Sequence, residues 1–155
     1  MYIWIVVAFV VIVDRISKVL IQNNFQLGES VAVIPGFFHI TYILNPGAAF
    51  GMLPGKTWFF VITGFLVVLG MILALIYFQT KISKSQKLVR ICMGMIAGGA
   101  LGNLYDRIFI GKVIDFLDFK VWSYIFNFAD SMIVVGGIAL AILIYLSDRT
   151  EKNNT

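Results

Sequence analysis

Two aspartates, Asp115 and Asp130, are the residues of this chain whose type and placement could do chemistry. Each stands in a short polar motif at the edge of a long apolar run. Carboxyl groups held close together with little water cannot both ionise easily, so one keeps its proton while the other can act as a base. Such a pair could hydrolyse an amide, because the carboxylate takes a proton from an attacking water while the acid protonates the carbonyl oxygen. Neither a nucleophilic side chain nor a metal is needed.

Each aspartate also has a simpler structural interpretation. Asp130 precedes the last apolar run, where a carboxylate can cap a helix N-terminus and gains up to about 1 kcal/mol from the helix dipole. Asp115 can be a solvated loop acid, or it can project toward the helices if its segment is extended. Only a fold can bring two residues so far apart in sequence together, so the residues by themselves define a candidate acid pair.

The composition indicates an integral membrane protein. The chain is 60% hydrophobic and 13% charged, and its mean hydropathy is +0.93, which leaves too few polar residues for a water-facing surface. Four windows, at about 2–21, 57–78, 88–106 and 131–146, approach the roughly 20 apolar residues that cross the hydrocarbon core of a bilayer. The first lacks the basic start and small-residue exit of a cleaved signal peptide, so we interpret it as a retained helix.

These windows predict an all-α polytopic membrane protein, with one membrane domain over residues 1–155 and four transmembrane helices. Between about residues 24 and 50, β-branched and aromatic residues broken by Pro35-Gly36 predict strands of a small extracytoplasmic β-sheet. The second outer segment, at about 110–128, is rich in Phe, Trp and Tyr, which favours a position at the membrane interface.

Basic residues predict the orientation of the chain. The segment 79–90 contains four basic residues and no acidic one, and short loops with such an excess face the cytoplasm. Four spans then place both termini in the cytoplasm and the two aspartates toward the outer face. Because topology accounts for the net charge of +4, we predict no nucleic-acid partner.

Cysteine and histidine usage argues against a metal or cofactor. The chain has one cysteine, Cys92, and one histidine, His39. A disulfide framework or a Cys-rich metal site is therefore impossible within one chain, and a single histidine without clustered carboxylates makes a poor metal site. We predict no metal and no cofactor.

The third window ends in a polar group of side chains. It first carries three glycines at spacings of four, a row that lets another helix pack closely: Gly94, Gly98 and Gly102. Asn103, Asp106 and Arg107 follow at offsets of three and four, so they share one side of the helix. Arg107 can either extend to the lipid headgroups or join an inward-facing cluster with the other two.

The first window contains Asp14 and Lys18, whose i,i+4 order favours an intrahelical ion pair. A buried ion pair destabilises the fold when some of its hydrogen-bonding groups lack partners. We therefore expect Asp14 to find further donors on a neighbouring backbone and to have a structural role. Arg15 has no partner that the sequence identifies.

Two other functions fit a membrane protein with these residues. A small ion- or proton-coupled carrier also places Asp and Arg inside helices, but it predicts charges nearer the bilayer midplane and duplicated halves. A non-catalytic scaffold would use the glycine row for association and the aspartates as caps. Asn at either aspartate would separate these alternatives, since a cap tolerates Asn and a proton-transferring pair does not.

Five motifs in this order resemble the lipoprotein signal peptidases (signal peptidase II), a family of aspartic proteases of the bacterial inner membrane. They are DRISK at 14–18, NPGAAF at 45–50, GGALGNLYDR at 98–107, VIDF at 113–116 and FNFADS at 126–131. The resemblance covers nearly the whole chain. It departs from the family pattern at Arg15, where Gln is usual, and at Leu44, where several relatives have Arg.

The resemblance implies a site and a substrate. Asp115 and Asp130 would be the catalytic dyad, with Asp14, Lys18 and Asp106 as structural polar residues. Residues that bind the substrate would be Asn45, Gly47, Asn103, Arg107, Asn127 and Ala129. Such an enzyme lies among membrane lipids and removes the signal peptide of lipid-modified prolipoproteins just before the diacylglyceryl-bearing cysteine. It would also be inhibited by globomycin-like cyclic peptides.

Overall fold

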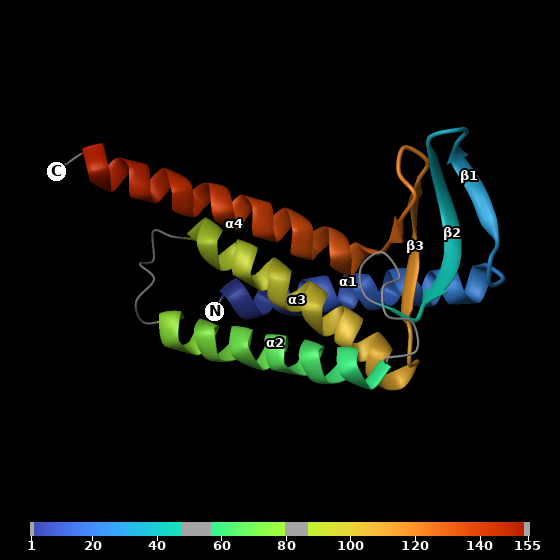
Figure 1. The fold of residues 1–155 in the computed structure, drawn as a ribbon, viewed down its shortest axis with the longest axis horizontal. Helices are drawn as coiled ribbons and strands as arrows, with labels where there is room; N and C mark the ends of the chain where they lie inside the picture. Colours follow the sequence, from blue (N-terminus) through green and yellow to red (C-terminus); the bar gives the residue numbers. More distant parts are fainter. Residues whose placement is uncertain (1, 48–56, 80–86, 154–155) are drawn as a thin grey trace.

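The computed structural model describes residues 2–47, 57–79 and 87–153. Two of the basic loop residues, Lys81 and Lys84, and the end of the NPGAAF motif lie outside these ranges. The described residues form four long helices that run along one another, with a small sheet across one end (Figure 1). The helices are α1 (Tyr2–Asn24), α2 (Thr57–Gln79), α3 (Lys87–Phe109) and α4 (Phe128–Asn153). α3 packs against each of the other three.

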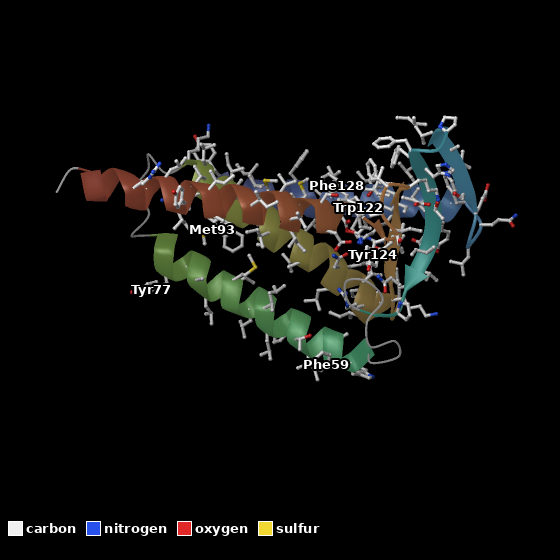
Figure 2. All side chains as sticks on the ribbon, turned by 45° about the horizontal axis from the view of Figure 1, so that its top comes forward. Phe59, Tyr77, Met93, Trp122, Tyr124 and Phe128 are labelled. Carbon is white, nitrogen blue, oxygen red and sulfur yellow. The ribbon has the colours of Figure 1, made fainter. Side chains whose placement is uncertain are left out.

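The outward-facing side chains of these helices are apolar. Phe9, Ile62, Val134 and Ile142 are each more than half exposed, and Figure 2 shows Phe59 and Tyr77 at opposite ends of α2. Helices that expose so much apolar surface are typical of proteins whose solvent is lipid.

Length and composition identify two helical stretches among the described residues that can cross a membrane, Lys87–Phe109 and Phe128–Ser147. The apolar stretch of α2, Val61–Ala74, is shorter than these two, and α1 includes the charged residues Asp14, Arg15 and Lys18. The four-span prediction is therefore supported for α3 and α4, and it stays a prediction for α1 and α2.

The sheet joins two segments that are far apart in the chain. Its strands are β1 (Ser30–Ile34), β2 (Phe38–Asn45), β3 (Val113–Phe119) and β4 (Ile125–Phe126). They lie in the order β1-β2-β3-β4, and each neighbouring pair is antiparallel. The outer segment that we expected only to lie at an interface thus supplies β3 and β4 of the predicted sheet. A turn at Pro35-Gly36, with φ 71° at the glycine, connects β1 to β2 as the sequence indicated.

Two packing features fix the helices and the sheet around the site. Ile21 near the end of α1 packs with Tyr42, Ile114 and Phe116 of the sheet in one apolar cluster. The glycine row of α3 lies against α1, since a Cβ on Gly98 would come within 2.7 Å of the Val10 Cβ. Without side chains in the way, α3 approaches α1 closely enough for their polar groups to meet.

Candidate active site

Asp115 lies on β3 and is almost fully buried, with 2% of its surface exposed. Each of its carboxylate oxygens accepts a hydrogen bond from an amide side chain. Asn127 Nδ2 donates to Oδ1 at 2.6 Å, and Asn45 Nδ2 donates to Oδ2 at 3.0 Å. The β2–β3 pairing brings Asn45 here, because Ile43 pairs with Asp115 in the ladder. Asp115 is therefore buried and hydrogen-bonded through both carboxylate oxygens, and it is not a solvated loop residue.

Asp130 lies in the first turn of α4 and is partly buried. Its Oδ2 accepts from the backbone N–H of Asn127 at 3.2 Å, and its own N–H donates to Asn127 Oδ1 at 2.9 Å. This reciprocal pair is a capping box in which Asn127 is the cap and Asp130 is the third helical residue. The N-cap of α4 is thus Asn127, and not Asp130 as in the simpler structural interpretation of that aspartate. Its other oxygen, Oδ1, accepts from Asn103 Nδ2 at 2.7 Å.

Asn127 connects the two aspartates. The same side-chain amide donates to Asp115 and accepts from the N–H of Asp130. Its Nδ2 also lies 3.1 Å from Asn103 Oδ1. The fully buried Asn127 side chain is therefore bound to the carboxylate of Asp115 and to the backbone of Asp130, while its own backbone N–H is bound to the Asp130 carboxylate.

The surroundings of Asp115 favour its protonated form near neutral pH. Burial first, and then the negative charge of Asp130, raise the pKa of Asp115 from 3.8 to about 7, although the hydrogen bonds from Asn45 and Asn127 lower it. A carboxyl group with a pKa near the working pH can act as a general acid.

A buried ion-pair group lies beneath the aspartates. Lys18, Asp14 and Asp106 have no exposed side-chain surface, and Lys18 Nζ lies 2.9 Å from Asp14 Oδ2 and 2.8 Å from Asp106 Oδ2. The intrahelical Asp14–Lys18 pair is present as the spacing predicted. Asp14 also finds a further backbone donor, since the N–H of Ala129 donates to its Oδ1 at 3.1 Å.

Arg107 points inward. Its Nη1 donates to the carbonyl of Asn103 at 3.3 Å, and its Nη2 lies 3.5 Å from the carbonyl oxygen of Gly47. The guanidinium group also interacts electrostatically with Asp130 and Asp115. Of the two alternatives for Arg107, the inward-facing cluster is the one found. Within the described residues, no group of three or more His, Cys, Asp or Glu side chains could hold a metal ion.

A family model, described as signal peptidase (SPase) II, matches residues 6–146. The chain belongs to the signal peptidase II family. A protein named lipoprotein signal peptidase from Desulfitobacterium hafniense is 58% identical over 98% of both chains, and one from Bacillus pumilus is 40% identical over 97% of both. A solved bacterial membrane enzyme, determined by the in meso method at 2.3 Å resolution, is 37% identical with a TM-score of 0.83, over 97% of this chain and 91% of that one.

Both departures from the signal peptidase II pattern have a place in the fold. Arg15 forms an ion pair with Asp106, and its guanidinium carbon lies 4.4 Å from the centre of the Tyr105 ring. No partner for Arg15 could be identified from the sequence, because α1 and α3 meet only through tertiary packing. Leu44 pairs with Ile114 in the β2–β3 ladder and packs against the apolar cluster.

The remaining residues that the resemblance connects with substrate differ in accessibility. Gly47 is buried, and its N–H donates to Asn45 Oδ1 at 2.9 Å. Ala129 is fully buried, and its N–H is bound to Asp14. These two residues shape the site through their backbone. The side chains that surround the aspartates come from Asn45, Asn103, Arg107 and Asn127.

Proposed function

We propose that this protein is a membrane aspartyl endopeptidase that removes signal peptides from lipid-modified precursors, with Asp115 and Asp130 as its catalytic pair. The observation that carries the proposal is the Asn127 amide, which binds Asp115 through its nitrogen and the N–H of Asp130 through its oxygen. The raised pKa of Asp115, about 7, assigns the resting proton to that residue. Asp130, with two donors on its oxygens, is the base.

The proposed reaction needs only water as co-substrate. The Asp130 carboxylate removes a proton from water as the water oxygen attacks the carbonyl carbon, and Asp115 gives its proton to the carbonyl oxygen. The tetrahedral intermediate then collapses. The carbon–nitrogen bond breaks, Asp130 returns its proton to the leaving nitrogen, and Asp115 recovers a proton from a hydroxyl of the intermediate. The products are a free carboxyl end and a free amine, and both aspartates regain their starting protonation states.

The proposed substrate is a prolipoprotein whose cysteine bears a diacylglyceryl group, with cleavage just before that cysteine. Two observations support it: relatives over nearly the full length are named lipoprotein signal peptidase, and apolar helix faces surround the polar site. Asn45, Asn103, Arg107 and Asn127 would bind the peptide near the scissile bond, where charged and amide donors can hold carbonyl oxygens. Gly47 and Ala129 would shape that site.

We further propose the membrane arrangement that fits this substrate. Residues 1–155 form one domain with four spans in the bacterial cytoplasmic membrane, both termini in the cytoplasm and the aspartates toward the outer face. There the signal helix and the lipid can both reach the site from the bilayer. A cyclic peptide of the globomycin type that occupies this site would inhibit the enzyme.

The test is cleavage of a diacylglyceryl-modified precursor peptide by the purified protein in lipid. Asp115→Asn and Asp130→Asn are compared with Asp118→Asn, a matched control on β3 whose carboxylate accepts from Thr41 at 2.6 Å and pairs with Lys120. The same peptide without lipid is assayed in parallel. We expect the parent and Asp118→Asn to cleave the lipid-modified peptide before its cysteine, and both dyad variants to lose at least about 100-fold in kcat, as expected when a general acid or base is removed.

The assay distinguishes three results. Equal cleavage of the peptide without lipid would remove the lipid-modified substrate from the proposal. Full activity of a folded Asp115→Asn or Asp130→Asn variant would exclude the aspartyl mechanism. A folded parent that leaves the lipid-modified peptide intact would return the carrier and scaffold alternatives to consideration.

A further inference from the structure

We propose that Lys18 is the positioning residue that sets the separation and the unequal protonation of Asp115 and Asp130. The proposal rests on the proposed function, since it assigns a role toward that same dyad. Lys18 lies on α1 and has no exposed surface, and its hydrogen bond and ion pairs go to residues other than Asp115 and Asp130. It acts through the three side chains on its ammonium group.

The ammonium group of Lys18 has three N–H donors and three oxygen partners. These are Asp14 Oδ2 at 2.9 Å, Asp106 Oδ2 at 2.8 Å and Asn103 Oδ1 at 3.1 Å. Asp14 is on α1, whereas Asp106 and Asn103 are on α3. A fully buried lysine with three oxygen neighbours keeps those neighbours close, because displacing them leaves its charge without compensation.

Two of these partners fix the backbone beside the dyad. Asp14 accepts from the N–H of Ala129 at 3.1 Å, and Ala129 immediately precedes Asp130. Asp106 accepts from the N–H of Ile114 at 3.2 Å, and Ile114 immediately precedes Asp115. One lysine thus connects, through one carboxylate each, to the residue before either catalytic aspartate. These two links set the distance between Asp130 at the start of α4 and Asp115 on β3.

The third partner determines which donor Asp130 receives. Lysine has donors only, so the Asn103 side chain must turn its oxygen toward Lys18 and its nitrogen toward Asp130. That nitrogen donates to Asp130 Oδ1 at 2.7 Å. Reversing the amide would place donor against donor at Lys18 and remove the hydrogen bond that Asp130 Oδ1 accepts. Lys18 therefore helps keep Asp130 as the base.

Charge supports the same role. The positive charge of Lys18 lowers the pKa of Asp115, although burial and Asp130 raise it by more. The other charged groups near Lys18 and the two aspartates are Asp14 and Arg15 from α1 and Asp106 and Arg107 from α3. Loss of the Lys18 charge would leave Asp14 and Asp106 facing the dyad with less compensation. The pKa of Asp115 should then rise.

The experiment measures kcat and KM for the lipid-modified precursor peptide from pH 5 to pH 9. It compares the parent with Lys18→Met, with the combined variant Lys18→Met/Asp14→Asn, and with Lys112→Met. The combined variant removes one positive and one negative buried charge together, so the net buried charge is retained. Lys112 is exposed on the chain between α3 and β3, and its replacement is the matched control for loss of one lysine charge.

We expect folded Lys18→Met to lose at least tenfold in kcat with KM changed less than threefold. The alkaline limb of its kcat profile should move up by about one pH unit, the size expected for removal of a nearby opposite charge. Lys112→Met should keep the parent profile. If Lys18→Met does not fold, the combined variant is expected to fold and to show the same selective loss of kcat.

Several results would overturn the proposal. Parent-like kcat and an unmoved alkaline limb in a folded Lys18→Met variant would do so, as would parent-like kcat in a folded combined variant. Loss of folding in both variants would also do so, because the role would then be structural alone. The proposed function fails separately, through activity in the folded Asp115→Asn or Asp130→Asn variants. The positioning role alone would be refuted if the parent cleaves the peptide, the two dyad variants do not, and Lys18→Met is fully active.

Discussion

Replacing Asp115 with Asn should abolish activity and at the same time remove most of the loss of stability that we expect for the parent as the pH rises. The folded protein keeps a proton on Asp115 up to about pH 7, because burial and then the Asp130 charge raise its pKa from 3.8. The unfolded chain releases that proton near pH 4. The folded state therefore binds more protons within this window, and its free energy of unfolding falls as the pH rises through it.

The size of the effect follows from the pKa values. At about 1.4 kcal/mol for each pH unit, the rise from 3.8 to about 7 corresponds to a loss on the order of 4 kcal/mol between pH 4 and pH 8. For a chain of this length, 1 kcal/mol moves the melting temperature by about 2 to 4 °C. The parent should thus melt several degrees lower at pH 8 than at pH 5.

The variant itself adds a constant cost. Both oxygens of Asp115 accept from amide nitrogens, Asn127 at one and Asn45 at the other. An Asn side chain turns an N–H toward one of these donors, which costs about 1 to 3 kcal/mol at every pH. The change of melting temperature with pH, and not its value at a single pH, is therefore the quantity to compare.

A thiol-reactive fluorescent dye can report the unfolding, because Cys92 is the one cysteine of the chain and is buried. We expect the melting temperature of the parent to fall between pH 5 and pH 8, and that of Asp115→Asn to stay nearly level. Asp118→Asn, on the same strand, should follow the parent. Parallel curves for the parent and Asp115→Asn would refute the assignment of the proton to Asp115.

Three further outcomes are expected. The kcat of the parent should fall as the pH rises above about 7, because Asp115 then loses the proton that it gives to the carbonyl oxygen; a flat profile with chemistry shown to limit the rate would contradict the dyad. Gly102→Ala should destabilise the protein by about 1 to 3 kcal/mol, since its Cβ would lie 2.5 Å from Asp14 Oδ2. Gly137→Ala on α4 has no atom within 4 Å of its Cβ and should not destabilise it, so equal melting temperatures for the two alanine variants would exclude this packing argument. Thr41→Val should lower stability by about 1 to 2 kcal/mol, because buried Asp118 loses its 2.6 Å donor, while kcat stays within twofold; a large loss of kcat in a folded variant would place the Thr41 contact in the catalytic site.

The polar network also explains how α1, an otherwise apolar helix, accommodates three charges in five residues. Asp14 and Lys18 are fully buried with Asp106, and Arg15 reaches the same Asp106 from the next position on α1. The glycines of α3 make this possible, since side chains there would keep α1 too far away. Charges that would be costly in lipid are paired inside the protein. A variant that removes one of them leaves its buried partner without a compensating charge.

The sequence by itself determined the local features of this protein. Long apolar runs predicted the helices, Pro35-Gly36 predicted the turn between two strands, and the i,i+4 spacing predicted the Asp14–Lys18 pair. Each depends on residues within a few positions of one another, where backbone geometry fixes the distance. The motif order likewise predicted the signal peptidase II family, which the matched family model confirmed.

Only the tertiary structure decided how these parts meet. Nothing local shows that residues 113–119 pair with β2, although this pairing brings Asn45 to Asp115. The sequence also did not show that Arg15 pairs with Asp106, or that Asn127 and not Asp130 caps α4. The proton on Asp115 has the same origin, because its pKa depends on burial and on the charge of Asp130, and folding alone creates both.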